Sequence, residues 1–502
     1  MIGRAWWIAV LAAGLSLLAA GWLLGREPAL PPNVVFILVD TLRADRMGAQ
    51  RNGEPVTPFL TRLAGESVYF PNGVSPSSWT RPAMASLLTS TYVDTHQVYF
   101  SIRNEDPEQP VSDALSTSFE TMAEYLTRHG YDAWACQTNV NLTEALGFAQ
   151  GYPEGHYLFS NGARADFVTG KALEALPTLK PPFFLYAHYM DPHAPYDAPE
   201  AYRSLFGPEP SLRPEEQQRI APDRFIDYLV DRVETVQGVK TAAEFPTLSP
   251  EGMDAVRQRY DAEVRFADDQ VARLVEALRR AYPNTLFVVL SDHGEEFWEH
   301  GGLGHGTSLY EEQIRVPLMF SGPGLTPRRI EAAVETLGLL PSIAAYLGLP
   351  PNPAWQGRSL LTNPDAAPDA AFARTKGPWA NLRVDLDAVV HEDHKLVLDH
   401  TRSGKALFRL DADPAEKRDL AGQDPARTAQ LEEFLARHRD ENLRRHAAQP
   451  VSPAPAIDAE TIERLQGLGY LGTVKEGEHH AIDPDQTRGR PVGEPLPAGQ
   501  ER

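Results

Sequence analysis

NVVFILVDTLRADR, residues 33–46, contains the stretch that decides the fold of this chain. Residues 33–40 form an apolar run rich in β-branched side chains, and the run ends in Asp40. A run of this kind, without polar alternation, is typical of a parallel strand that is buried on both faces. The sequence therefore predicts a buried strand with a carboxylate at its end.

Two later runs repeat this form, each with polar residues at its end. They are FFLYAHYMD at residues 183–191 and TLFVVLSD at residues 285–292, and a helical pattern at residues 254–281 precedes the second. Strands that alternate with helices predict an α/β fold with a doubly wound parallel sheet, in which ligands bind outside the carboxyl ends of the strands. We expect the three strand ends to share one face.

The rest of the chain divides by composition into an insertion, a second unit and a tail. Residues 205–250 are rich in proline and charge, which favours an insertion or lid. Residues 388–411 predict two antiparallel strands around a Ser-Gly turn, followed by a helix over residues 426–446. We therefore expect a catalytic domain over residues 33–365, a smaller α+β subdomain over residues 366–446 and a largely disordered tail over residues 447–502.

Length and charge exclude several classes of protein. The chain has 502 residues, enough for a large α/β domain with appendages, and its net charge of −21 argues against nucleic acid as a partner. Cys136 is the only cysteine, so an internal disulfide and a thiolate metal cluster are both excluded. An anionic substrate must therefore be bound by a local site.

The N-terminus has the composition of a membrane anchor. Arg4 precedes an apolar run at residues 5–25 with tryptophans near its ends, and such a helix would be about 31 Å long. A cleaved signal peptide is the alternative, but Trp22 and two leucines follow the small residues where cleavage would occur. We expect residues 1–28 to hold the protein on the cell membrane as a single-pass anchor, with the catalytic domain outside the cytoplasm, periplasmic or extracellular.

A metal site is predicted where two of the strands end. Asp40 ends the first strand, and Asp292 and His293 end the third. Two carboxylates with one imidazole suit zinc or manganese, while calcium and magnesium are possible but less favoured by the nitrogen ligand. The alternative is that an Asp at a strand end only caps the next helix.

A nucleophile is predicted in SSWTRPAMASLLTS, residues 77–90. Pro82 suits the first position of a helix that runs to about Thr89, which places Thr80 just ahead of the helix N-terminus. Free amides and the helix dipole would hold a tetrahedral anion there, and a metal bound to the same oxygen would make Thr80 a nucleophile. The alternative is a threonine in an ordinary capping turn.

Histidines supply candidates for proton transfer. They are His188 and His193 in HYMDPHAPY, and His300 and His305 in a glycine-rich loop. A loop histidine can protonate a leaving group, bind a phosphate or sulfate, or ligate a second metal.

Taken together, these motifs resemble the sulfatase family of the alkaline phosphatase-like superfamily. The matching stretches are NVVFILVDTLRADR, SWTRPAMASLLTS, DPHAPY, SDHGEEFWEHGGLGHG, YEEQIRVPL and FRLDADPAEKRDLA, in the family's order, between residues 33 and 421. The resemblance implies a mostly parallel sheet with a C-terminal four-stranded sheet subdomain. It also implies metal ligands at Asp40, Asp292 and His293, with Thr41 where many sulfatases have a second Asp ligand.

The resemblance further implies the roles of three residues around the reacting group. Thr80 falls at the position of the nucleophile, where it would also contact the metal. His193 matches a histidine that contacts the transferred group, and His305 lies near a basic residue on the leaving-group side.

The sequence departs from the sulfatase pattern at the nucleophile. Sulfatases convert a Cys or Ser to formylglycine within C-x-P-x-R, and the residues here are Thr80, Arg81, Pro82, Ala83 and Met84. Threonine cannot become formylglycine. Asn139 and Asn141 stand where sulfatases have a Lys and a His. A threonine nucleophile is similar to phosphotransfer branches such as phosphodiesterases, lipoteichoic acid synthase and lipid A phosphoethanolamine transferase.

The expected activity is metal-dependent hydrolysis of a sulfuric or phosphoric ester through Thr80. His193 or His305 would assist the leaving group, and Arg81 or the amides of the following helix would hold the charge. The substrate would be a small molecule, a glycan or a lipid ester. A membrane-associated phosphoglycerol- or phosphoethanolamine-type transferase and a catalytically silent glycan-binding homologue are the alternatives.

Overall fold

The structure is a computed structural model that describes residues 30–101, 112–226, 228–229, 248–362, 370–377 and 384–450. The predicted anchor at residues 1–28 and the predicted tail beyond residue 450 lie outside the described residues.

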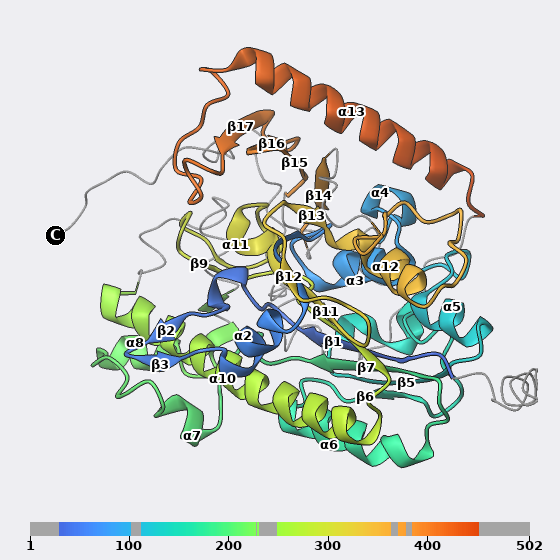
Figure 1. Ribbon diagram of the computed structural model, residues 1–502. Coiled ribbons are helices and arrows are strands. Elements are labelled where there is room, and N and C mark those ends of the chain that lie inside the picture. The colour runs from blue at the N-terminus through green and yellow to red at the C-terminus, as the bar shows by residue number, and fades with distance from the viewer. Residues whose placement is uncertain are drawn as a thin grey trace, which may run out of the picture.

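The core of the catalytic part is a 9-stranded sheet with β1 (Asn33–Val39) near its centre (Figure 1). β1 pairs in parallel with β7 (Phe183–Tyr189) and with β8 (Thr285–Leu290). The remaining strands are β5 (Asp132–Gln137), β6 (Tyr157–Phe159), β11 (Arg315–Ser321), β4 (Val68–Val74), β12 (Arg328–Arg329) and β13 (Val334–Glu335). Only β11 runs antiparallel to its neighbours, so the predicted mostly parallel α/β sheet is confirmed.

Two hydrophobic cores cover the two faces of this sheet, because successive side chains of β1 point to opposite sides. Val35 and Ile37 face one core and Val34 and Phe36 face the other, all without solvent exposure. Helices α2 (Pro58–Gly65), α6 (Ala165–Ala175) and α10 (Pro250–Ala281) contribute to the first core, and α3 (Thr80–Thr89), α5 (Met122–Arg128) and α12 (Leu339–Tyr346) contribute to the second. Burial on both faces explains the continuous apolar runs in the sequence.

The carboxyl ends of β1, β7 and β8 meet at one edge of the sheet. Leu38 of β1 pairs with His188 of β7 and with Leu290 of β8. The residues that follow each strand therefore emerge side by side, as the sequence predicts.

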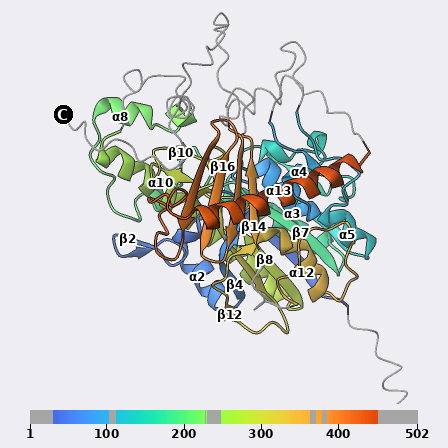
Figure 2. The ribbon, with the colours of Figure 1, turned by 90° about the horizontal axis from the view of Figure 1, so that it is seen from above.

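A 4-stranded antiparallel sheet forms a second layer over the catalytic part and lies toward the viewer in Figure 2. Its strands are β14 (Ala371–Thr375), β15 (Leu386–His391), β16 (His394–Asp399) and β17 (Gly404–Arg409), and α13 (Pro425–Ala447) packs on them through Leu431 and Leu435. The two strands predicted around the Ser-Gly turn are confirmed as β16 and β17, and the four-stranded sheet that the resemblance implies is present. The sequence pattern did not predict β15, part of which lies in residues 388–411. An additional hairpin turns at Glu392, which adopts φ 56° without being glycine, so the turn has no glycine signal.

A buried ion-pair triad joins the small sheet to the catalytic part. Lys395 of β16 has no solvent exposure, and its Nζ lies 3.0 Å from Glu311 Oε1 and 2.9 Å from Glu416 Oε1. Glu311 begins α11 (Glu311–Ile314), which lies next to the loop that carries His305. The triad therefore links the small sheet to the start of α11 in the catalytic part.

The proline-rich insertion packs on the main domain in its described part. It includes α7 (Glu200–Arg203) and α8 (Pro214–Arg219), and Phe206, Ile220 and Phe225 are buried in the larger core. Residues 230–247 lie outside the described residues, and a role as a lid stays a prediction.

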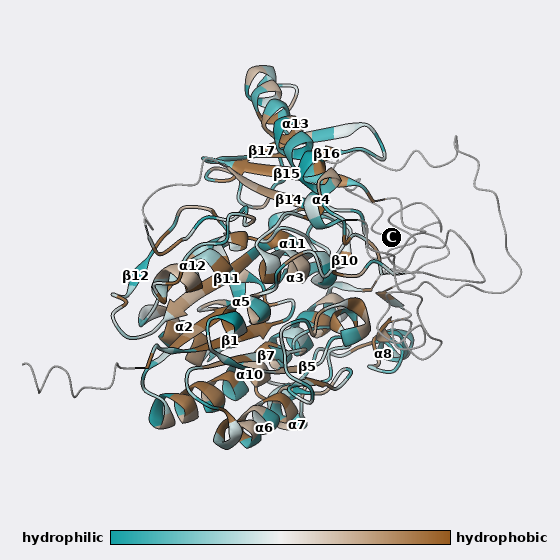
Figure 3. Cartoon of the chain, turned by 90° about the vertical axis from the view of Figure 1, so that its right-hand side faces the viewer, coloured by the Kyte–Doolittle hydropathy of each residue, from teal (hydrophilic) through white to brown (hydrophobic). Residues whose placement is uncertain are grey.

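The single-pass membrane placement predicted from the sequence requires correction. Within the described ranges, no helix combines the length and the apolar character needed to cross a bilayer. The two long helices, α10 and α13, carry charged side chains along their length, and much of α13 has a hydrophilic colour in Figure 3. The apolar run on which the placement was based lies outside the described residues.

Candidate active site

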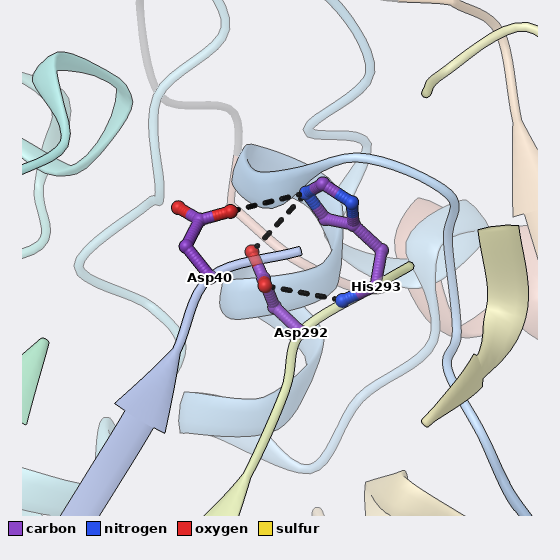
Figure 4. Close-up of side chains that lie close together, drawn as sticks. All are labelled: Asp40, Asp292 and His293. Carbon is purple, nitrogen blue, oxygen red and sulfur yellow. Dashed lines mark hydrogen bonds and ion pairs between the residues drawn. The ribbon is translucent and has the colours of Figure 1, made fainter. Parts of the chain in front are cut away.

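Asp40, Asp292 and His293 come together at the carboxyl ends of β1 and β8 (Figure 4). One ligand atom of each lies within 4.8 Å of the others. His293 Nε2 is 3.6 Å from Asp40 Oδ1 and 3.4 Å from Asp292 Oδ2, and none of the three side chains is exposed. The structure thus brings together the three predicted metal ligands.

The chemistry of this group fits a divalent cation. Asp40 Oδ1 and Asp292 Oδ2 are buried and accept no hydrogen bond from any residue that the structure describes. His293 Nδ1 lies 2.9 Å from Gly294 O, so Nδ1 carries the hydrogen and Nε2 presents a lone pair toward the two carboxylates. A cation would satisfy all three atoms at once.

Burial perturbs the protonation of the same residues. Burial and the neighbouring Asp40 carboxylate raise the pKa of Asp292 well above its usual range. Burial also lowers the pKa of His293 to about 3, so its imidazole is neutral and able to ligate. For Asp40, burial acts to raise the pKa, but the His188 hydrogen bond and the neighbouring histidines outweigh it and hold the pKa low.

Gly294 allows the backbone after His293 to approach another loop closely. Its N–H donates to Gln313 O at 2.9 Å, and a Cβ at this position would lie 2.1 Å from Glu312 O. Any side chain at Gly294 would therefore displace the segment that carries His293.

Two buried residues of β7 form a chain of hydrogen bonds that ends on Asp40. His188 Nε2 lies 3.0 Å from Asp40 Oδ2, and the Tyr186 hydroxyl lies 3.0 Å from His188 Nδ1. The sequence singled out His188 without a role, and it missed Tyr186. Their spacing of two residues on β7 was the available signal, because it places both side chains on one face of the strand.

Thr80 lies beside the metal-ligand group at the start of α3. Its Oγ1 is 3.2 Å from His293 Nε2 and 3.3 Å from Asn139 Nδ2. The helix begins at Thr80, two residues earlier than predicted, because Trp79 occupies the extended cap position. Pro82 then takes the third helical position, where a backbone N–H would equally lack an intrahelical partner.

Thr41, the next residue after Asp40, has a left-handed backbone with φ 58°. Its Oγ1 is buried and finds no hydrogen-bond partner within the described part of the chain. The residue after Asp40 therefore offers a hydroxyl oxygen and not a carboxylate.

Arg81 follows Thr80, and its guanidinium is turned to a neighbouring loop. Nη1 donates to the carbonyl oxygens of Phe100 and Ser101 at 3.0 Å each, and Nη2 donates to Asn141 Oδ1 at 2.8 Å. The side chain has no solvent exposure. These bonds anchor α3, and the charge-holding role of Arg81 stays a prediction.

The rings of His193 and His305 lie close to this group. The ring centroid of His305 is 4.4 Å from that of His293 and 4.9 Å from that of His193. His193 Nδ1 lies 2.6 Å from Ala194 O. The structure therefore places His305 beside His293 and His193 beside His305, and their roles in proton transfer stay a prediction.

Glu295 holds His305 in position, although sequence reasoning gave it no role. Its Oε1 lies 2.9 Å from His305 Nδ1, and its Oε2 accepts a bond from the Tyr196 hydroxyl at 3.1 Å. Burial raises the pKa of Glu295 to about 7 and lowers that of His305 to about 4. Burial lowers the pKa of His193 as well.

His300 lies apart from this group, in the loop that follows β9 (Glu296–Phe297). Its ring stacks on Tyr310 with 3.5 Å between centroids, and its Nε2 lies 3.2 Å from Glu416 O. These contacts place His300 between the loop and the small sheet.

Comparison with known proteins identifies the family of the chain. Residues 32–349 match the family model described as Sulfatase. The chain is 24% identical to the iduronate 2-sulfatase of Mus musculus, over 64% of this chain and 69% of that protein. It is also 24% identical to the multifunctional alkaline phosphatase superfamily protein PehA of Trinickia caryophylli, over 83% and 98%.

Among solved structures, the phosphonate monoester hydrolase SpPMH of Silicibacter pomeroyi has the same fold. It superposes with a TM-score of 0.62 at 22% identity, over 83% of this chain and 97% of that one. Members of the sulfatase family are generally metal-dependent, in keeping with the group formed by Asp40, Asp292 and His293. The chain belongs to the sulfatase family of the alkaline phosphatase-like superfamily, and it is a hydrolase that acts on esters.

Proposed function

We propose that this protein hydrolyses a sulfuric or phosphoric ester, with Thr80 as the nucleophile beside a divalent metal held by Asp40, Asp292 and His293. One observation carries the proposal: Thr80 Oγ1 lies 3.2 Å from His293 Nε2, next to two buried carboxylate oxygens that lack donors among the described residues. Zinc or manganese is favoured because one of the three ligands is an imidazole.

When bound, the metal supplies positive charge that lowers the pKa of the Thr80 hydroxyl and stabilises the charge on the ester oxygens. Thr80 Oγ1 then forms a bond to the sulfur or phosphorus while the bond to the leaving oxygen breaks. The hydroxyl proton of Thr80 passes to His305 or His193, and that histidine gives it to the leaving oxygen. In the second half, water attacks the threonine ester, the same histidine takes the proton of the water and returns it to Thr80 Oγ1, and sulfate or phosphate is released.

Glu295 and the start of α3 have supporting roles in this scheme. Glu295 accepts from His305 Nδ1, which leaves His305 Nε2 for the proton of the leaving group or of water. The first turn of α3 directs its backbone amides and the positive end of its dipole toward an anion bound at Thr80.

The relatives indicate the class of substrate. Their names include an iduronate 2-sulfatase and a phosphonate monoester hydrolase, so both sulfuryl and phosphoryl centres occur among related sites. We propose a small-molecule or glycan ester as the substrate. The presence of Thr80 with all three ligands favours an active enzyme over a silent binding module.

The test compares turnover of p-nitrophenyl sulfate with that of mono- and bis-p-nitrophenyl phosphate after reloading with zinc, manganese or calcium. Thr80→Ala should lower kcat at least about 1000-fold, because it removes the nucleophile. Thr80→Ser, which keeps a hydroxyl at the same place, is the matched control and should retain measurable turnover. Unchanged turnover in Thr80→Ala, with folding and metal content intact, would refute the assignment.

A further inference from the structure

We propose that Asn139 is a catalytic residue that donates a hydrogen bond to the oxygen of Thr80, and that its lack of charge makes the site prefer singly charged esters. This inference rests on the proposed function and adds a residue and a substrate class to it.

The local backbone gives the Asn139 amide one orientation. Asn139 follows β5 and caps the short 3-10 helix Val140–Leu142, where its Oδ1 accepts from Asn141 N at 2.9 Å. Its own backbone N–H donates to Gln137 Oε1 at 2.9 Å. Because Oδ1 is engaged with the backbone, the NH2 group must point to the opposite side.

On that side the NH2 group contacts a proposed metal ligand, Asp40, and the proposed nucleophile, Thr80. Nδ2 donates to Asp40 Oδ2 at 2.9 Å and lies 3.3 Å from Thr80 Oγ1. Asn139 has no solvent exposure, so water does not compete for these bonds. Asn139 thus connects a metal ligand to the nucleophile.

This geometry determines how the Thr80 hydroxyl is used. An amide NH2 can only donate, so Thr80 Oγ1 accepts from Asn139, and the hydroxyl hydrogen must point elsewhere. One lone pair of Oγ1 is thereby occupied and the oxygen is held in place for attack. When Thr80 bonds to the sulfur or phosphorus and the leaving oxygen departs, Asn139 loses no proton and remains a donor to the new ester.

The charges around the nucleophile favour a singly charged ester. A divalent cation would balance the two ligand carboxylates, and the guanidinium of Arg81, next to Thr80, is already bonded to the carbonyl oxygens of Phe100 and Ser101 and to Asn141 Oδ1. A lysine in the place of Asn139 would add a full positive charge beside Thr80, whereas the asparagine adds none. A sulfate monoester or a phosphodiester carries one negative charge, but a phosphate monoester above its second ionisation carries two and needs more compensation.

The catalytic role is tested with Asn139→Ala. We expect kcat to fall about 10- to 100-fold, which is the effect of losing one hydrogen bond to a charged group, with KM changed less than threefold. Asn139→Ser, which keeps a short donor, should recover part of the loss. Asn72→Ala is the control, since Asn72 donates to Glu331 O in a solvent-exposed hydrogen bond and accepts from Arg315 Nη1.

Metal affinity must be measured on the same variants, because Asn139 also bonds to Asp40. A kcat within twofold of wild type in metal-loaded Asn139→Ala would overturn the catalytic role. A kcat loss that disappears at saturating metal would also overturn it, since Asn139 would then act only through Asp40. If Thr80→Ala abolishes turnover but Asn139→Ala does not, this inference fails while the proposed function stands.

The charge preference is tested with bis-p-nitrophenyl phosphate against p-nitrophenyl phosphate on wild-type enzyme. The ratio of their kcat/KM values should rise as pH passes the second ionisation of the monoester, about 6 for a phosphate monoester, because the effects of enzyme ionisation cancel in the ratio. Asn139→Lys should lower that ratio at pH 8 at least about tenfold. A wild-type ratio that does not rise with pH would overturn the preference, whether or not the lysine variant folds.

Discussion

Replacing His188 by Phe should weaken metal binding although His188 is not itself a proposed ligand. Among the residues that the structure describes, two donate to Asp40 Oδ2: His188 Nε2 at 3.0 Å and Asn139 Nδ2 at 2.9 Å. Phenylalanine keeps a ring at this fully buried position but supplies no N–H. The variant therefore removes a hydrogen bond without opening a large cavity.

The magnitude follows from the burial of the pair. A hydrogen bond to an ionised group contributes about 1.5–3 kcal/mol, and donors behind a metal ligand typically affect metal affinity about 10- to 100-fold. Tyr186→Phe removes only the hydroxyl at His188 Nδ1, so its effect should be smaller than that of His188→Phe.

Competition with a chromophoric chelator would measure the dissociation constant for zinc in wild type and both variants. The loss in His188→Phe should be greater at pH 5.5 than at pH 7.5. The reason is that the His188 bond helps to hold the pKa of Asp40 low, so the variant lets protons compete with the metal as pH falls. A zinc affinity of His188→Phe within twofold of wild type at both pH values would refute the reasoning.

The remaining predictions concern stability. Removing the metal by chelation should lower the Tm, and the difference in Tm between the metal-bound and the metal-free protein should become smaller as the pH is lowered toward about 4. Burial raises the pKa of Asp292 in the folded protein, so protonation of Asp292 stabilises the metal-free fold. This stabilisation is complete below the unfolded pKa of about 3.9 and is lost as the pH rises. Thermal melts from pH 4 to 8 that run parallel with and without metal would contradict this. Lys395→Met should cost about 3–5 kcal/mol in urea unfolding, because it leaves Glu416 buried without a cation, whereas the double change with Glu416→Gln should recover part of the loss. Equal stability of Lys395→Met and wild type would show that the triad does not hold the two layers together.

The order of strands and helices could be predicted because it depends on local patterns. The runs at β1, β7 and β8 are continuous in hydrophobicity, since both faces of each strand are buried. The hairpin at Glu392 could not be predicted, because no local pattern marks its turn. Its turn residue adopts a left-handed backbone that the sequence does not signal with glycine.

The start of α3 and the membrane placement show where local patterns mislead. A proline indicates the first turn of a helix but not which position within it, so the helix begins at Thr80 and not at Pro82. An apolar run indicates a spanning helix only through its composition, and the described helices contain none that could cross a bilayer.

By itself, the sequence determined the α/β class and the meeting of Asp40, Asp292 and His293, because parallel strands bring their carboxyl ends to a common edge. Only the tertiary structure decided the partners of those ligands. Asn139 and His188 are 99 and 148 residues from Asp40 in the chain, and each reaches it across a different strand end. Such bonds have no local pattern, because they depend on which side chains the packing of the sheet and α3 brings within 3 Å of one another.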